Sequence, residues 1–93
     1  MTKGQKLFNS MIVMLSLHYP HLHHMTVREG RDNAYNNDNW VLHSILNVMI
    51  HHYPKYADKT FSYLQSRAGE MEYKELKKNE QDLFKRRNEE NGA

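Results

Sequence analysis

Histidine is the residue type with the most evident capacity for chemistry in this sequence. Four of the seven histidines fall within seven residues, and another stands at the end of a similar stretch later in the chain. Neutral imidazoles bind zinc, copper and nickel, so these positions are the candidates for a metal site. However, the chain has no cysteine, no His-Glu-x-x-His motif and no carboxylate close to the cluster. We therefore expect no metal and no cofactor. A His-rich metal-binding protein ranks third among our interpretations, with the weak candidates His18, His21, His23, His24 and His52.

Catalytic motifs are missing from the rest of the sequence. Without cysteine there is no thiol nucleophile, and the four glycines do not form a phosphate-binding loop. Ser10 and Ser44 lie in apolar stretches with a helical pattern rather than on a sharp turn. Any histidine could pair with Asp38 or Asp58 as acid and base, but nothing in the spacing requires it. We expect no catalytic residue and a protein that is not an enzyme.

Residue types that favour protein interfaces gather between positions 28 and 40. Six of the twelve residues in 28–39 are Asn or Asp, which favour turns because they hydrogen-bond their own backbone. This segment is therefore predicted to be a long irregular loop. Arg, Tyr and Trp are enriched in interface hot spots, and a loop held between helices is typical of a binding site. The first partner-binding candidates are Arg28, Arg31, Tyr35 and Trp40.

The C-terminal segment adds a set of basic candidates. The net charge of +2 is uneven, because residues 1–69 carry seven Lys/Arg against four Asp/Glu, whereas residues 70–93 carry six against seven. Neither part has the strong basic surplus that is typical of nucleic-acid binding. A nucleic-acid-binding protein that uses the Arg28–Arg31 loop and the basic C-terminal helix is our alternative interpretation. The basic candidates are Lys77, Lys78, Lys85, Arg86 and Arg87.

One stretch of sequence occurs twice in the chain. Each copy is an apolar segment that ends in His-Tyr-Pro, at positions 18–20 and 52–54. Proline disfavours helical geometry at the residue before it, so each copy predicts a helix that ends at the tyrosine. Three interpretations remain open: a helical solenoid, for which two copies are few; two similar helix ends that arose by chance; or a pseudo-symmetric pair of hairpins around one core.

Apolar periodicity predicts the remaining elements. Thr2 is expected to cap a first helix that starts at Lys3, and a short helix is expected within 21–27. A core helix over 40–52 would be capped at position 37 or 38, and residues 55–68 would pack back on it as an αα-hairpin. The apolar residues of the first helix cover more than one face, so neighbouring helices or another chain should bury them. In the core helix the expected buried stripe is Val41, Ile45, Val48 and Met49, widened by Leu42, Leu46 and Ile50.

These elements predict an all-α fold, a small bundle of three to four helices built on two helix–His-Tyr-Pro units. Residues 1–69 would form the core domain, and Gly69 would end or kink the helix before it. Residues 70–93 would form a charged, protruding C-terminal helix that frays from about residue 88.

The combination of these features predicts a non-enzymatic protein that binds and regulates or inhibits another macromolecule. A protein partner is expected, with nucleic acid bound directly or through that partner as the alternative, and with homodimerisation as a further expectation. Small proteins rich in Asn and Lys are common in phages and mobile elements, which suggests an inhibitor of a host complex in the host cytoplasm. The apolar run over 11–17 is too short to span a bilayer and lacks a cleavage site for a secretory signal, so no membrane association is expected.

Overall fold

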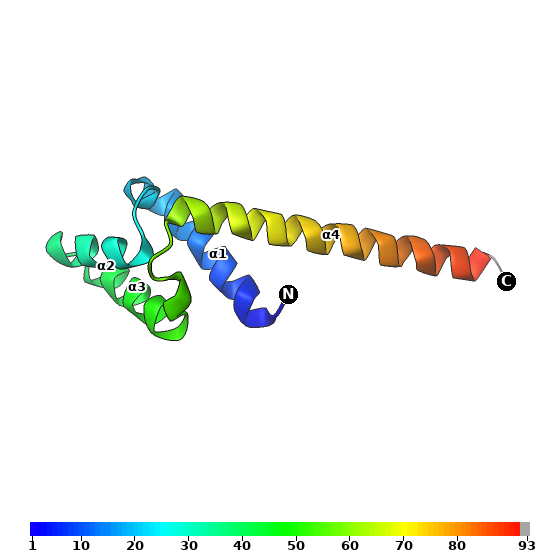
Figure 1. Ribbon diagram of the computed structural model, residues 1–93, viewed down its shortest axis with the longest axis horizontal. Helices are drawn as coiled ribbons and strands as arrows, with labels where there is room; N and C mark the ends of the chain where they lie inside the picture. The colour runs from blue at the N-terminus through cyan, green and yellow to red at the C-terminus, as the bar shows by residue number, and fades with distance from the viewer. Residues whose placement is uncertain (92–93) are drawn as a thin grey trace.

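The chain is built almost entirely from helices. The computed structural model describes the backbone of residues 1–91 and the side chains of residues 1–86. Within that range there are four α-helices, two short 3-10 turns and no strand beyond a single isolated bridge, which confirms the predicted all-α fold (Figure 1). In chain order the elements are α1 (Lys3–His18), η1 (Pro20–Leu22), α2 (Val27–Asn36), α3 (Trp40–His52), η2 (Pro54–Tyr56) and α4 (Phe61–Asn91).

Side-chain caps fix where the helices begin. The predicted cap of α1 is confirmed, because the Thr2 hydroxyl accepts the Gln5 backbone N–H at 3.1 Å. Helix α2 begins at a full capping box, in which Thr26 and Glu29 each accept the other's backbone N–H at 3.1 Å. Helix α3 is capped by Asn39, one residue beyond the two predicted positions.

The sequence repeat is also a structural repeat. Each copy runs from a long helix through a prolyl 3-10 turn into a second helix, and the alignment of the two copies makes Met25 equivalent to Lys59 and Val27 equivalent to Phe61. The Phe61 N–H donates to the Met25 carbonyl at 3.0 Å, and the Val27 N–H donates to the Lys59 carbonyl at 3.2 Å. If each residue is replaced by its equivalent in the other copy, the first of these hydrogen bonds becomes the second, and the second becomes the first. This relationship is expected for two units related by an approximate two-fold axis. The structure thus favours the pseudo-symmetric pair over a chance similarity.

The two units interlock instead of packing as separate hairpins. Helix α2 packs on α3, and its symmetry counterpart α4 packs on α1. The predicted αα-hairpin of residues 55–68 with the preceding helix is wrong, because the 54–60 turn carries the chain away from α3 before α4 begins at Phe61. The shared core contains at its centre the fully buried side chains Ile12, Leu22, Leu42, Leu46, Phe61 and Leu64.

The predicted irregular loop over 28–39 is wrong, because most of it is α2. The capping box at Thr26 starts the helix, and three small residues on one face, Val27, Gly30 and Ala34, are buried against the core. Most of the Asn and Asp residues point away from that face, where their turn preference is overridden by packing. The short helix predicted within 21–27 is reduced to the three-residue turn η1.

Several apolar side chains that were expected to be buried are exposed. In α3 the buried stripe is Leu42, Leu46 and Met49, whereas Val41 and Val48 face solvent. The symmetry-related positions of α1, Leu7 and Met14, are exposed as well. A helix that is apolar on most sides does not reveal from sequence which side will face the core, and here the buried side, centred on Leu46, overlaps the predicted stripe only in part.

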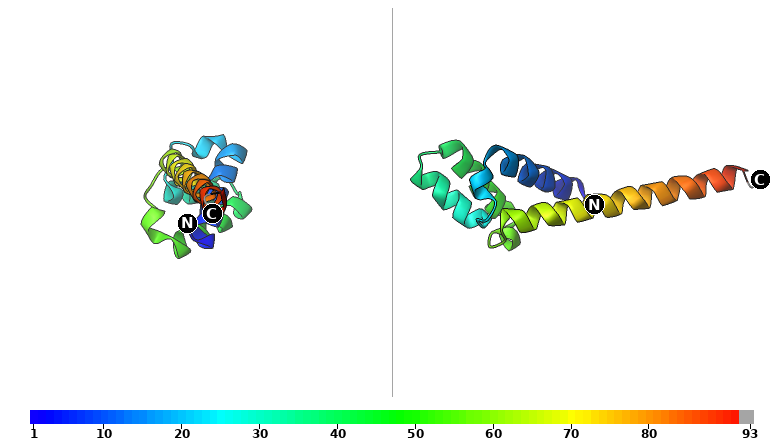
Figure 2. Two further views of the ribbon diagram at one scale, coloured as in Figure 1. Left: turned by 90° about the vertical axis from the view of Figure 1, so that its right-hand side faces the viewer. Right: turned by 90° about the horizontal axis from the view of Figure 1, so that it is seen from above.

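Helix α4 protrudes far beyond the helices that pack around it. The molecule measures 65 × 21 × 19 Å, and α4 forms most of its length, as the right-hand view in Figure 2 shows. The helix continues through Gly69, so the predicted stop at this residue is wrong. Helical backbone extends to Asn91, and the last two residues of the predicted frayed tail lie outside the described part of the chain. Across the described residues, no helix combines the length and hydrophobicity that crossing a bilayer requires.

Candidate partner-binding site

Two exposed aromatic side chains lie together where α2 turns into α3. Tyr35 is in the last turn of α2 and is 70% exposed, and Trp40 is the first residue of α3 and is 76% exposed. With Asp38, His43 and Ser44 they line an open hollow of about 530 Å³. We call these five residues the aromatic tip. Because large aromatic side chains are rarely left this exposed together without a role, the aromatic tip is the strongest candidate site on the molecule.

The turn that carries the aromatic tip is firmly held. Asp38 adopts a left-handed backbone conformation, with φ of 56°, which closes the three-residue link between the helices. The Asn39 N–H donates to the Ala34 carbonyl at 2.9 Å, while the Asn39 side chain caps α3 through the Leu42 N–H at 3.1 Å. Ala34 and Leu42 are buried directly below. The aromatic rings therefore project from a fixed base, so little conformational entropy would be lost when they bind.

His43 connects the aromatic tip to α2. Its Nδ1 lies 3.1 Å from the Arg31 carbonyl oxygen, and its ring lies 5.5 Å from the Tyr35 ring, centroid to centroid. The Arg31 guanidinium reaches Asp32 at 3.1 Å and the Asn47 side chain at 3.4 Å. Arg31 thus contacts the aromatic tip through its backbone, while its guanidinium lies at Asp32 and Asn47 with its charge partly neutralised.

Arg28, which was predicted to belong to the same site, pairs with a residue outside the aromatic tip. Its Nε is 3.1 Å from an Asp58 carboxylate oxygen, in the turn that precedes α4. The pair joins the two structural units at the surface, where a single ion pair contributes about 0–1 kcal/mol. Of the four predicted candidates in 28–40, Tyr35 and Trp40 line the same hollow, Arg31 contacts it through its backbone carbonyl, and Arg28 lies two helical turns before Tyr35 and pairs with Asp58.

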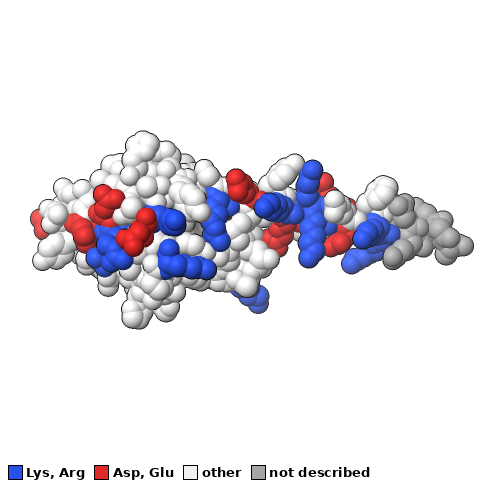
Figure 3. Space-filling model, viewed as in Figure 1, with Lys and Arg blue, Asp and Glu red and all other residues white. Residues whose placement is uncertain are grey.

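The basic candidates of the C-terminal segment lie at the other end of the molecule. Figure 1 places α2 and the far end of α4 at opposite ends, so α2 and the basic residues of α4 form no continuous surface in one chain. On the face shown in Figure 3, acidic and basic side chains alternate along α4. Arg87 lies outside the residues whose side chains are described. The described candidates, all exposed, are Lys77, Lys78, Lys85 and Arg86.

The histidine candidates do not converge on a metal site. Within the described part of the chain, no three His, Asp or Glu side chains are close enough together to hold a metal ion. His23 and His24 contact each other edge to face, with centroids 4.6 Å apart, and His18 and His52 sit at equivalent helix ends in the two units. His21 instead lines a polar hollow with asparagines of the α2–α3 turn, next to the aromatic tip.

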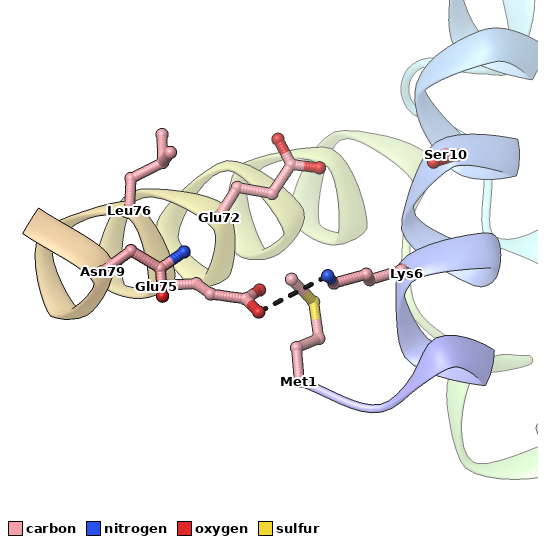
Figure 4. Close-up of a pocket in the computed structure, with 7 residues that line it drawn as sticks. All are labelled: Met1, Lys6, Ser10, Glu72, Glu75, Leu76 and Asn79. Carbon is pink, nitrogen blue, oxygen red and sulfur yellow. Dashed lines mark ion pairs between the residues drawn. The ribbon is translucent and has the colours of Figure 1, made fainter. Parts of the chain in front are cut away.

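A second groove, of about 330 Å³, separates the start of α1 from α4. Lys6 and Glu75 point toward one another across it and form an ion pair at 3.5 Å (Figure 4). Its other lining residues include Ser10, Glu72 and Leu76, with no histidine to activate the serine. The groove offers an apolar edge and two carboxylates, an arrangement suited to contact with another side chain rather than to nucleophilic chemistry.

Sequence reasoning missed part of the surface around the aromatic tip. Val41 and Val48 extend it along α3 with Ser44 between them, at spacings of three and four residues. The sequence repeat could have indicated this surface. Leu7, Ser10 and Met14 of the first copy are equivalent to Val41, Ser44 and Val48, so both copies carry two apolar residues around a serine on the same helix face. Comparison with family models, with curated proteins and with solved structures gave no match. The assignment of function therefore depends on the chemistry of the surface alone.

Proposed function

We propose that this chain is a non-enzymatic binding protein that regulates or inhibits a partner protein, which it contacts through the aromatic tip. The observation that carries the proposal is that Trp40 and Tyr35, exposed by 76% and 70%, line the same hollow at a hydrogen-bonded turn between two helices. Burial of two such rings against a partner removes a large apolar area from water, while the tyrosine hydroxyl and indole N–H remain available for hydrogen bonds. A phage-type inhibitor of a host complex fits this description.

The expected partner surface is an apolar pocket with a polar rim. The aromatic tip offers apolar rings, bordered by the polar side chains of Asp38 and Ser44. Exposed Val41 and Val48 widen the apolar contact along α3. This mixture matches the anatomy of protein interfaces, in which an aromatic centre is surrounded by polar residues that exclude water.

The test is affinity capture from lysate of the native host, in low and high salt and after nuclease treatment, followed by binding measurements with the purified partner. Trp40→Ala is expected to raise the dissociation constant roughly 30-fold, the effect of losing a strong hot spot. Tyr63→Ala is the matched control, because Tyr63 is a half-exposed aromatic residue on α4, and it should leave affinity unchanged. Equal affinity of the Trp40→Ala variant would contradict the proposal.

The same experiment separates the nucleic-acid alternative. Contacts from Lys and Arg to phosphates release counterions, so that binding would weaken steeply with salt and disappear after nuclease treatment. Docking through the aromatic tip should survive both conditions. A labelled duplex that bound with a steep salt dependence, and lost affinity when Lys85 and Arg86 became Ala, would favour the alternative.

A further inference from the structure

The free part of α4 has an apolar stripe that no other part of the described chain covers. Tyr73, Leu76, Leu83 and Phe84 are exposed by 60%, 63%, 63% and 66%. At 100° per residue they fall within an arc of about 100° on the helix surface, turned well away from the buried Leu64 and Ala68. Glu80 lies in the same arc and interrupts it.

Acidic and basic side chains are interspersed along this helix (Figure 3), but their balance changes with position. Residues 70–75 contain three glutamates and one lysine, whereas residues 77–87 contain five Lys/Arg and two acidic residues. The acidic part, residues 70–75, lies where α4 leaves the domain, and the basic part, residues 77–87, follows it and precedes two further glutamates at positions 89 and 90. A second α4 laid alongside in the opposite direction would place acidic part against basic part twice, whereas a parallel arrangement would oppose like charges twice.

We propose that α4 binds the same segment of a second copy of this chain as an antiparallel helix pair, with the apolar stripes facing each other. Two copies of α4 can be complementary in charge, because each copy supplies both an acidic part and a basic part. In this register Tyr73 packs against Leu83 of the second copy, and Glu72 faces Arg86 of the second copy. The same register sets Glu80 opposite Leu76 of the second copy, with Lys77 of that copy beside the carboxylate to offset part of its cost, and it brings the two copies of Lys77 near each other at the centre.

We call the contact between the two apolar stripes the seam. Because the seam is short, it predicts a reversible dimer rather than a permanent one. Four apolar side chains per copy are fewer than a stable obligate interface uses, so dimerisation should depend on concentration. The proposal does not rest on the proposed function, because the aromatic tip lies at the opposite end of the molecule from the stripe (Figure 1).

Sedimentation equilibrium of the full chain over a wide concentration range tests the proposal. The wild-type protein is expected to show a monomer–dimer equilibrium, and Leu83→Glu should raise the dissociation constant at least about tenfold, because it places a carboxylate in the seam. Leu83 is exposed, so this substitution should leave the fold intact, as circular dichroism would verify. Leu17→Glu is the matched control, since Leu17 is 71% exposed on α1 and should leave the equilibrium unchanged.

The orientation is tested by disulfide trapping, which has no background because the chain contains no cysteine. Positions 72 and 86 are two heptads apart and so lie on the same flank of the stripe. A mixture of Glu72→Cys and Arg86→Cys chains should form mainly the mixed dimer upon oxidation. Predominant 72–72 and 86–86 products would overturn the antiparallel arrangement. A wild-type chain that stays monomeric throughout, or a dimer that persists unchanged in Leu83→Glu, would overturn the seam itself.

Discussion

Thr26 and Thr60, which occupy equivalent positions in the two repeats, face each other in an isolated antiparallel bridge where the two structural units meet. Each threonine also caps the helix that follows it: the Thr26 hydroxyl accepts the Glu29 N–H, and the Thr60 hydroxyl accepts the Tyr63 N–H, both at 3.1 Å. Glu29 and Tyr63 are themselves equivalent positions of the repeat. The two threonines thus perform the same two tasks, one in each repeat, and they connect the start of α2 to the start of α4.

This equivalence predicts matched effects of removing the two caps. Thr26→Ala and Thr60→Ala should each lower the free energy of unfolding by about 1 kcal/mol, because a helix N–H loses its side-chain acceptor. Urea denaturation followed by far-UV circular dichroism measures both. The Thr→Ser variants keep the hydroxyl and should cost much less. A large effect at one position and none at the other would count against equivalent roles in the two repeats.

The two glycines in helix interiors should respond to alanine with opposite signs. A Cβ on Gly30 would lie 3.0 Å from Leu22, 3.2 Å from Leu46 and 3.2 Å from Phe61, three fully buried side chains that have no room to move. Gly30→Ala should lower the free energy of unfolding, because overpacking costs about 1–3 kcal/mol and outweighs the gain in helix propensity.

Gly69→Ala provides the matched comparison. Nothing lies within 4 Å of a Cβ at Gly69, so the substitution should raise the free energy of unfolding by about 1 kcal/mol. Urea denaturation at low protein concentration measures this effect without interference from self-association. Stabilisation by alanine at both positions would show that the packing around Gly30 is looser than the distances indicate.

The buried hydroxyl of Tyr56 predicts a stabilising substitution. Tyr56 is 6% exposed, and its hydroxyl has no hydrogen-bond partner among the described residues. The equivalent position in the first repeat is Leu22, which is entirely apolar. Tyr56→Phe should raise the free energy of unfolding by up to about 1 kcal/mol, because it removes an unsatisfied polar group. Tyr63→Phe is the control at a half-exposed position and should change nothing; a loss of stability in Tyr56→Phe would reveal a partner for the hydroxyl.

Truncation of α4 should separate its packed part from its free part. Removal of residues 77–93 should leave the thermal transition cooperative, with the free energy of unfolding changed by less than about 0.5 kcal/mol. Removal of residues 71–93 should be more costly, because it also deletes the Lys6–Glu75 ion pair and the Met71 side chain that covers the buried Asn9. Differential scanning calorimetry of both truncated chains checks this order, and equal stabilities would contradict it.

The helix ends could be predicted from sequence, whereas α2 could not. Tyr19-Pro20 and Tyr53-Pro54 end α1 and α3 as predicted, because the steric effect of proline is local and independent of the fold. Helix α2 depends on contacts between distant residues. Gly30 is a poor helix former in isolation, but it is required where Leu46 and Phe61 approach the helix backbone.

The candidate site was predictable in its residue types but not in its arrangement. Tyr35 and Trp40 stood out because such residues favour interfaces, yet their proximity depends on how α2 packs on α3. Arg28 shows the limit of that reasoning, since its ion pair with Asp58 joins residues 30 positions apart. The exposure of Val41 could not be predicted from sequence, because α3 is apolar on most sides and only one of those sides packs against the core.

The position of Trp40 has a practical consequence for spectroscopy. It is the only tryptophan in the sequence and is 76% exposed, so its fluorescence should be red-shifted and nearly insensitive to the opening of the core. The same indole lies at the centre of the aromatic tip, where a docked partner would shield it from water and shift its emission to the blue. The protein thus carries a built-in optical reporter of that one surface, which can be read without any label.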